Sequence, residues 1–320
     1  MGKTLIFIIF GPLLLSILFW RQNNGVVNNF VTETYSLKSD SSEGKKCTDC
    51  HSALYEKNIK HPVSAEKGCA DCHQGNGSEH PKTAVIAFSL VEKAPDLCFT
   101  CHSKIKNLIA SSPIVHQAVN QDNFCLNCHS PHSSTEKKLL VSNKQDMCFS
   151  CHNKTITTKT KTLSNMEQLF KSSKTIHPPF KRCSQVCHNA HGSANNNLLN
   201  IPFPEDEYVP ADNASFGLCF ECHDSEKISD STTTTATNFR NGDKNLHFVH
   251  INGEKGRKCT MCHNVHATNN QHLIKDKVKF GSWDFNMNHK SNETGGSCLP
   301  GCHNERKYYR LILNPDSVRN

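Results

Sequence analysis

The feature that most constrains this chain is a repeated pattern of two cysteines followed directly by a histidine. All 18 cysteines of the 320-residue sequence belong to it, in seven C-x-x-C-H motifs and two motifs with one more residue between the cysteines, "CSQVCH" and "CLPGCH". Zinc knuckles and disulfide frameworks also use closely spaced cysteines, but neither requires a histidine after every second cysteine. The pattern is typical of covalent c-type haem attachment, in which the thiols bind the two vinyl groups and the histidine binds the iron.

The motifs predict nine covalently attached haem c groups, whose sites we number 1 to 9 in chain order. Residues three and four apart share one face of a helix, so both thiols and the histidine of a motif reach one macrocycle. The predicted thioether cysteines are Cys47, Cys50, Cys69, Cys72, Cys98, Cys101, Cys125, Cys128, Cys148, Cys151, Cys183, Cys187, Cys219, Cys222, Cys259, Cys262, Cys298 and Cys302. The predicted proximal iron ligands are His51, His73, His102, His129, His152, His188, His223, His263 and His303.

Eleven further histidines are available for the opposite side of the irons. Three lie three residues after a proximal histidine, and several lie six to nine residues before the first cysteine of a motif. This regularity favours ligation over the ordinary solvated histidine. We therefore predict mainly bis-histidine haems, with the distal candidates His61, His80, His116, His132, His177, His191, His250, His266 and His289. Outside this pattern, we predict that His247 and His272 are bystanders and that Met147, Met166, Met261 and Met287 are packing residues.

The motifs form an internal repeat. One unit has a leading histidine, a motif, a trailing histidine, a short apolar stretch and a second motif. We call its four copies modules 1 to 4; they run from His61 to His102, His116 to His152, His177 to His223, and His250 to His303, with site 1 standing alone before them. The last copy is stretched and less regular.

The segments "IVHQAVNQDNFCLNCHSPHSSTEKKLLVSNKQDMCFSCH" and "IHPPFKRCSQVCHNAHGSANNNLL" through "GLCFECH" resemble the doubled C-x-x-C-H motif family of multihaem cytochromes c. The resemblance covers most of residues 45–305 and implies an electron carrier. Module 4 departs from the pattern, because a long segment and several surplus histidines separate its two motifs.

Only 36% of the residues are hydrophobic, which predicts that haem groups supply much of the interior. The fold class that we expect is mostly irregular, with short α-helices at the motifs and little or no β-sheet. The predicted domains are a signal peptide or anchor (1–24), a polar linker (25–44), a five-haem lobe (45–152), a linker (153–176), a four-haem lobe (177–310) and a C-terminal tail (311–320).

The amino terminus predicts the compartment. After Lys3, residues 4–20 are mostly apolar, and a polar stretch follows. This pattern indicates a secretory signal or a membrane anchor, and the absence of a small-residue cleavage site favours an uncleaved anchor in the inner membrane. Either interpretation places the haem region outside the cytoplasm, in the periplasm or at the cell surface.

These features predict an electron-transfer protein rather than an enzyme. Its partners would be other redox proteins, such as a membrane quinol oxidase or periplasmic and outer-membrane cytochromes. The formal charge of +7 does not indicate nucleic-acid binding, because each haem adds two propionates that outweigh it. Two alternatives are a reductase or oxidase of a small nitrogen or sulfur compound with one open haem site, and a subunit of a haem filament.

Overall fold

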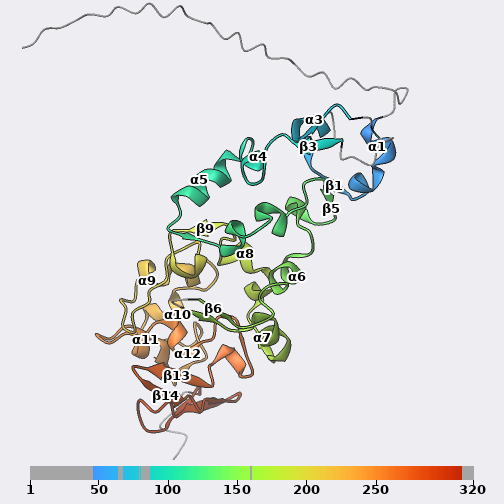
Figure 1. Ribbon diagram of the computed structural model, residues 1–320. Helices are drawn as coiled ribbons and strands as arrows, with labels where there is room; N and C mark the ends of the chain where they lie inside the picture. The colour runs from blue at the N-terminus through green and yellow to red at the C-terminus, as the bar shows by residue number, and fades with distance from the viewer. Residues whose placement is uncertain (1–45, 64–67, 79, 81–86, 159–160, 312–320) are drawn as a thin grey trace, which may run out of the picture. The chain divides into compact units, whose positions relative to one another are not determined.

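The computed structural model describes residues 46–63, 68–78, 80, 87–158 and 161–311 (Figure 1). The predicted anchor at 4–20, the linker at 25–44 and almost all of the predicted tail lie outside these ranges. Both predicted lobes fall within one compact unit, residues 42–320. Among the described residues, no helix has the length and apolar character needed to cross a membrane.

Helices in the described part are short, and most of them carry a haem motif. The first cysteine of each of sites 1 to 8 lies in a helical turn, whereas Cys298 of site 9 ends a strand. The α-helices are α1 (Cys47–Cys50), α3 (Cys69–Cys72), α4 (Asp96–Phe99), α5 (Ser103–Ser111), α6 (Lys144–Phe149), α7 (Met166–Ser172), α8 (Cys183–Val186), α9 (Asn213–Phe220), α10 (Glu226–Ser229), α11 (Leu246–Ile251) and α12 (Cys259–Cys262). The 3₁₀ turns are η1 (Ser52–Tyr55), η2 (Gln117–Asn120), η3 (Phe124–Asn127), η4 (Lys137–Leu139), η5 (Pro178–Arg182), η6 (Asn196–Leu198) and η7 (Gln271–Leu273).

The strands are equally short and form separate antiparallel ladders. Each described ladder has two strands except β15-β16-β17, which has three. The strands are β1 (Ile59–Lys60), β2 (His73–Gly75), β3 (Phe88–Leu90), β4 (Ile114–Val115), β5 (Ser133–Ser134), β6 (Ile156–Thr157), β7 (Thr162–Leu163), β8 (Thr175–Ile176), β9 (Gly192–Ser193), β10 (Arg240–Asn241), β11 (Lys244–Asn245), β12 (Ala267–Thr268), β13 (Lys277–Phe280), β14 (Trp283–Asn286), β15 (Lys290–Ser291), β16 (Gly295–Cys298) and β17 (Arg306–Tyr309). The segment 153–176, predicted as a linker, contains the hairpin β6–β7, helix α7 and strand β8.

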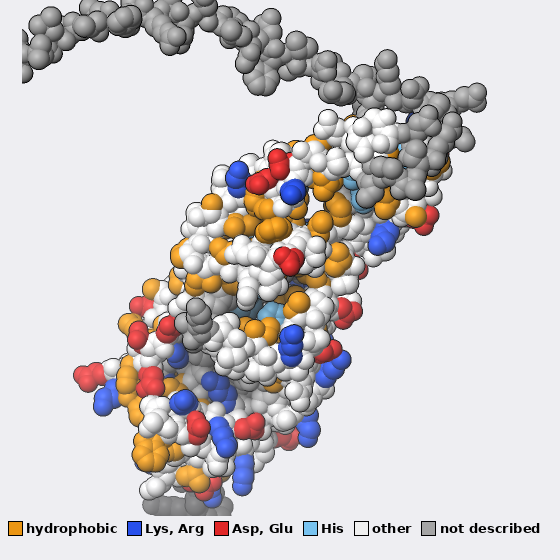
Figure 2. Space-filling view, in the orientation of Figure 1, with side chains coloured by type: hydrophobic (Ala, Val, Ile, Leu, Met, Phe, Trp, Pro, Cys, Tyr) orange, Lys and Arg blue, Asp and Glu red, His pale blue; other side chains and the backbone are white. Residues whose placement is uncertain are grey.

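Buried apolar side chains are concentrated towards the C-terminus. One cluster contains Val209, Phe216, Ile228 and Ile251, and a second contains Ile274, Val278 and Met287. Before residue 150, the buried hydrophobic side chains of the described chain are Ala87, Leu140 and Phe149. Figure 2 shows hydrophobic side chains at the surface of the face that carries α4 and α5, and more charged side chains around the C-terminal elements. The N-terminal half therefore has little core of its own.

Asn245 joins several elements of the C-terminal half. Its side chain is fully buried and accepts hydrogen bonds from the backbone N–H groups of His247 (3.0 Å) and Phe248 (3.2 Å), which caps α11. The same amide donates to the carbonyl oxygens of Lys227 (3.1 Å) and Asp230 (2.9 Å) beside α10. One amide thus satisfies two backbone donors and two backbone acceptors, which no apolar side chain can replace.

Asn245→Ala should lower the free energy of unfolding by roughly 2 to 4 kcal/mol, because it removes the cap of α11 and the two bonds to the α10 region. Denaturant unfolding followed by far-ultraviolet circular dichroism measures this loss. Asn143→Ala is the matched control, since Asn143 also caps a helix through one backbone N–H (3.0 Å) but is exposed. We expect it to cost about 1 kcal/mol. Equal costs for the two variants would contradict the special role of Asn245.

Candidate haem sites

Eight of the nine proximal histidines face a second histidine at nearly the same spacing. Their ring centres lie 5.9–6.4 Å apart, and seven of the pairs have ring planes within 24° of parallel. The exception in angle is the pair at site 3, whose planes meet at 42°. The pairs, proximal histidine first, are His51–His80, His73–His132, His102–His61, His129–His191, His152–His116, His188–His266, His223–His177 and His263–His247.

This spacing fits a metal ion held between two imidazoles. A metal–imidazole bond is about 2.0 Å long, so two rings that bind one ion from opposite sides have centres about 6.3 Å apart. Imidazoles in direct stacking contact would lie closer together. The residues present therefore fit bis-histidine haem, with the two cysteines of each motif available for the thioether bonds.

Hydrogen bonds at the other ring nitrogen orient these imidazoles. Nδ1 of the proximal histidines His129, His188 and His263 lies 2.8–2.9 Å from a backbone carbonyl oxygen, and the distal His177 makes the same contact at 2.9 Å. Since a carbonyl only accepts, Nδ1 carries the proton and Nε2 is left to bind a metal.

The carbonyl that faces each of these three proximal histidines comes from a strained turn. Lys138, Asn197 and His272 occupy equivalent positions in η4, η6 and η7 and have φ of 57–61°, and the leucine after each has φ of 56–58°. Side chains with Cβ atoms disfavour this left-handed region. The strain is held by two bonds to the motif, one from Nδ1 and one of 2.7 Å from the next backbone N–H to the leucine carbonyl. The apolar "LL" stretch of the repeat thus orients the proximal ligand.

The distal histidines of modules 1 to 3 are brought together in twos by backbone bonds. The N–H of each leading histidine donates to the carbonyl of the trailing histidine of the next module, from His61 to His132 (2.8 Å), His116 to His191 (3.1 Å) and His177 to His266 (2.9 Å). The ladders β1–β5, β4–β9 and β8–β12 continue these contacts. A leading histidine therefore faces the proximal histidine of the second site of its own module, and a trailing histidine faces that of the first site of the module before it.

The arrangement differs near module 4. His247, predicted as a bystander, faces His263 at 6.4 Å, and the hydroxyl of Thr237 lies 2.9 Å from its Nδ1. The bystander prediction for His247 is therefore not what the geometry favours. The prediction selected histidines that lie at a repeated sequence distance from a motif. His247, on α11, lies at no such distance. His272 keeps its side chain outside the pairs and contributes its backbone carbonyl to site 8.

Site 9 is the remaining site, and the structure does not pair it. All 20 histidines lie in the described ranges, and none of them places its ring opposite His303 at the spacing of the other sites. The distal candidate His250 stacks on Phe239 at 5.7 Å, and the candidate His289 has its Nε2 3.4 Å from the Tyr308 hydroxyl.

Burial keeps the imidazoles in the form that binds metal. Burial, with the neighbouring histidine charges, lowers the pKa of His247 and of His266 to about 4, and the pKa of His116 and His191 is lowered for the same reason. A neutral imidazole is the ligating species, so these sites do not require loss of a proton at neutral pH.

The cysteines reveal which sites are neighbours. The first cysteines of sites 1 and 2, 3 and 4, 5 and 6, and 7 and 8 lie beside each other. The neighbouring thiol raises the pKa of Cys69, Cys98, Cys148 and Cys259, together with burial. At the other four steps, burial and the charge of the next site's second cysteine raise the pKa of the second cysteines of sites 2, 4, 6 and 8, which are Cys72, Cys128, Cys187 and Cys262. Each site therefore has a cysteine near a cysteine of the next site in the sequence, and first and second cysteines alternate in this role along the chain.

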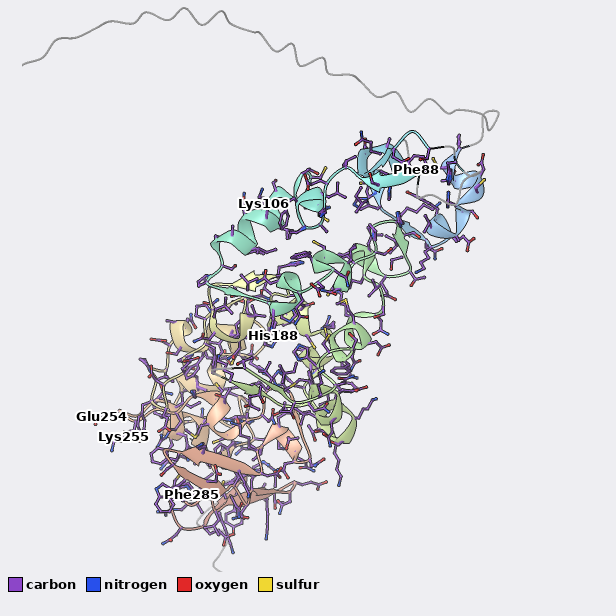
Figure 3. All side chains as sticks on the ribbon, viewed as in Figure 1. Phe88, Lys106, His188, Glu254, Lys255 and Phe285 are labelled. Carbon is purple, nitrogen blue, oxygen red and sulfur yellow. The ribbon has the colours of Figure 1, made fainter. Side chains whose placement is uncertain are left out.

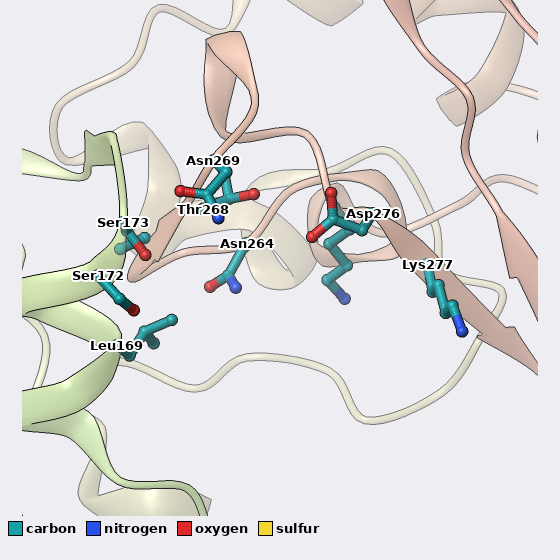
Figure 4. A pocket seen from close by; sticks show the side chains of 10 residues that line it. Leu169, Ser172, Ser173, Asn264, Thr268, Asn269, Asp276 and Lys277 are labelled. Atoms are coloured by element: carbon teal, nitrogen blue, oxygen red, sulfur yellow. The ribbon is translucent and has the colours of Figure 1, made fainter.

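An open pocket of about 520 Å³ lies outside these sites, between α7 and the strands β12 and β13 (Figure 4). It is lined by Leu169 and by hydroxyl, amide and charged groups such as Ser172, Asn264 and Asp276. No histidine or cysteine lines it, so this pocket is not a candidate haem site.

Paired imidazoles at the spacing of one metal ion, each beside a cysteine motif, define a c-type cytochrome. The family model of the doubled CXXCH motif matches residues 61–107, 116–157 and 177–228, which are modules 1 to 3 with short extensions. Three copies of the doubled CXXCH motif indicate a multihaem c-type cytochrome. A comparison with curated proteins finds no match.

His132→Ala should convert one haem from low spin to high spin, because the iron loses one axial imidazole. The structure predicts that this haem is the one attached through Cys69 and Cys72, since His132 faces His73 at 6.2 Å. Electron paramagnetic resonance and resonance Raman spectra of the purified protein count the high-spin haems.

Two comparisons make the assignment of His132 specific. His272→Ala should leave every haem low-spin, because its imidazole belongs to none of the pairs. In a protein that lacks site 2 through Cys69→Ala and Cys72→Ala, adding His132→Ala should produce no further high-spin haem. A high-spin signal that persists there would show that His132 serves another site.

His247→Ala should likewise produce one high-spin haem, at site 8, because no other described histidine faces His263. His289→Ala is the control, since His289 contacts a tyrosine hydroxyl rather than a proximal imidazole. The same spectra distinguish the two variants, and a low-spin His247→Ala protein would contradict the pairing.

Proposed function

We propose that this protein is an extracytoplasmic nine-haem cytochrome that carries electrons along a chain of mainly bis-histidine haems between redox partners. The observation that supports this proposal is that, at each step from site 1 to site 9, a cysteine of one site lies close enough to a cysteine of the next to act on its thiol electrostatically. When bound, haem supplies one-electron iron chemistry. Neighbouring sites at every step favour transfer along the whole chain.

The paired imidazoles support a carrier rather than a catalyst. With two protein ligands on opposite sides, a site offers no open position to a substrate, and the ligands keep their geometry in both oxidation states. The carbonyl bonds at Nδ1 of His129, His188 and His263 hold these rings in place. Multihaem cytochromes of this family usually transfer electrons.

Location and partners follow from the class of protein. Multihaem c-type cytochromes are typically extracytoplasmic, and we propose the periplasm or cell surface, with residues 4–20 as the inner-membrane anchor. The electron donor or acceptor would be a membrane quinol oxidase or another periplasmic or outer-membrane cytochrome. The pairs found within one chain at sites 1 to 8 favour a self-contained carrier over a filament subunit with ligands shared between chains.

The alternative function, a reductase or oxidase with one open haem site, is favoured by one observation at site 9. His303 faces no other histidine in the described chain, so reduction of a small nitrogen or sulfur compound would take place there. The repeat opposes this alternative, because the leading histidine of each earlier module serves the second site of the same module, and His250 is the leading histidine of module 4. We assign His250 to site 9 on that ground. A resonance Raman spectrum of the wild-type protein with one five-coordinate haem would favour the enzyme instead.

Removing the middle site should split the electron path. The protein is tethered to an electrode by a C-terminal tag, and site 5 is removed by the double substitution Cys148→Ala and Cys151→Ala. At fast scan rates, sites 6 to 9 should still exchange electrons with the electrode, whereas sites 1 to 4, beyond the gap, should exchange them more slowly. Protein-film voltammetry measures the exchanged charge, and mass spectrometry establishes nine attached haems in the wild type and eight in the variant.

The matched control removes a terminal site. Cys47→Ala with Cys50→Ala also deletes one haem but leaves no gap, so all eight remaining sites should exchange together. If the variant without site 5 exchanged as completely as the variant without site 1, electrons would not travel from site to site in sequence order.

A further inference from the structure

A threonine hydroxyl contacts the histidine that faces the proximal ligand of site 8. Oγ1 of Thr237 lies 2.9 Å from Nδ1 of His247, whose ring centre lies 6.4 Å from that of His263. Thr237 is buried, with 8% of its surface exposed, and its hydroxyl also accepts a hydrogen bond from the backbone N–H of Phe239 at 3.0 Å. The contact is therefore shielded from water, where a hydrogen bond is electrostatically stronger than in solution.

Thr237 belongs to the loop 230–239, which joins α10 to β10 and is fastened to the start of α11. The backbone N–H of Leu246, the first residue of α11, donates to the carbonyl of Phe239 at 3.0 Å. The ring of Phe239 also packs edge-on against that of His247, with the ring centres 5.2 Å apart. The loop thus holds the hydroxyl and the imidazole in fixed positions relative to each other.

At other sites, the corresponding contact is made by the backbone. His188, labelled in Figure 3, has its Nδ1 2.8 Å from the carbonyl oxygen of Asn197, and Nδ1 of the distal His177 lies 2.9 Å from the carbonyl oxygen of Val265. A carbonyl can only accept a hydrogen bond, whereas a hydroxyl can donate or accept. At site 8 the partner of the imidazole is a side chain, so a single substitution removes it.

Metal binding fixes the direction of the hydrogen bond between Thr237 and His247. Nε2 must be unprotonated to bind iron, so Nδ1 carries the proton and donates it to the hydroxyl oxygen. Donating this proton makes the imidazole a more basic ligand. A more basic ligand stabilises ferric iron more than ferrous iron, because the ferric ion carries one more positive charge. Thr237 therefore acts on the iron through His247.

We propose that Thr237 is a positioning residue of site 8, whose hydroxyl holds His247 in its ligating form and lowers the reduction potential of the haem bound there. This inference rests on the proposed haem loading of site 8 and adds to it a residue that belongs to no motif. The loop 230–239 supplies at site 8 the contact that module 4 supplies to His177 through Val265.

The test is a redox titration of the haem-loaded full-length protein, followed by visible absorption and electron paramagnetic resonance. Thr237→Val replaces the hydroxyl with a methyl group of similar size. It should move one of the nine titrating components to higher potential and leave the spin state of every haem unchanged. Thr237→Ser keeps the hydroxyl and should keep that component near its wild-type potential. Thr237→Ala also lacks the hydroxyl, so it should shift the same component in the same direction and serves if the valine variant does not fold.

Thr268 provides the matched control. It is also buried, and its hydroxyl also accepts from the backbone N–H two residues later, that of Asn270 at 3.4 Å. It donates to the carbonyl of Ile274 at 3.1 Å rather than contacting an imidazole, so Thr268→Val should leave all nine components in place. In a His247→Ala protein, adding Thr237→Val should shift no component further, because the hydroxyl acts through that imidazole.

The outcomes separate this inference from the proposed function. Hydroxyl-free variants that titrate like the wild type would overturn the inference. A shift of equal size in Thr237→Ser or Thr268→Val would also overturn it, since packing rather than the bond to His247 would then be responsible. The absence of covalent haem at site 8 in the mass spectrum of the wild-type protein would instead contradict the proposed function.

Discussion

The structure depends on the requirement that two imidazoles meet across one iron at a fixed spacing. In modules 1 to 3, this requirement explains why such short strands exist. The ladders β1–β5, β4–β9 and β8–β12 each lie next to a backbone bond between a leading histidine and a trailing histidine, such as His116 and His191. The ladders therefore act as clamps that hold two distal ligands side by side. At site 8, helix α11 places His247 opposite His263 instead, and Asn245 caps this helix.

The same requirement makes the two halves of the chain unequal in how they are stabilised. The C-terminal half has two apolar clusters, and burial of such side chains contributes about 25 cal/mol per Å². The N-terminal half has few buried apolar side chains and relies on the groups that its motifs bind. Exposed hydrophobic residues such as Phe88 and Leu90 are consistent with this difference.

The sequence predicts the motifs well because their geometry is local: two thiols and one imidazole within a single turn. The trailing offset of His132, His191 and His266 was also visible, because it recurs. The sequence did not reveal which site each of these histidines faces, because each lies in one module and faces a proximal histidine of another. His247 was missed because it lies at no repeated distance from a motif. The left-handed turns at Lys138, Asn197 and His272 share no residue type, so only the leucine that follows each of them could have indicated these turns.

The crossing of ligands between modules has a consequence for how such a chain lengthens. Each internal module gives one histidine to the module before it and receives one from the module after it. A duplicated module inserted between two others would therefore receive a histidine from the module after it and give one to the module before it. The remaining modules would need no change. Two sites are paired differently: site 1 faces His80 of module 1, and site 8 faces His247 on α11. An added copy of an internal module would therefore keep a facing histidine at each of its sites.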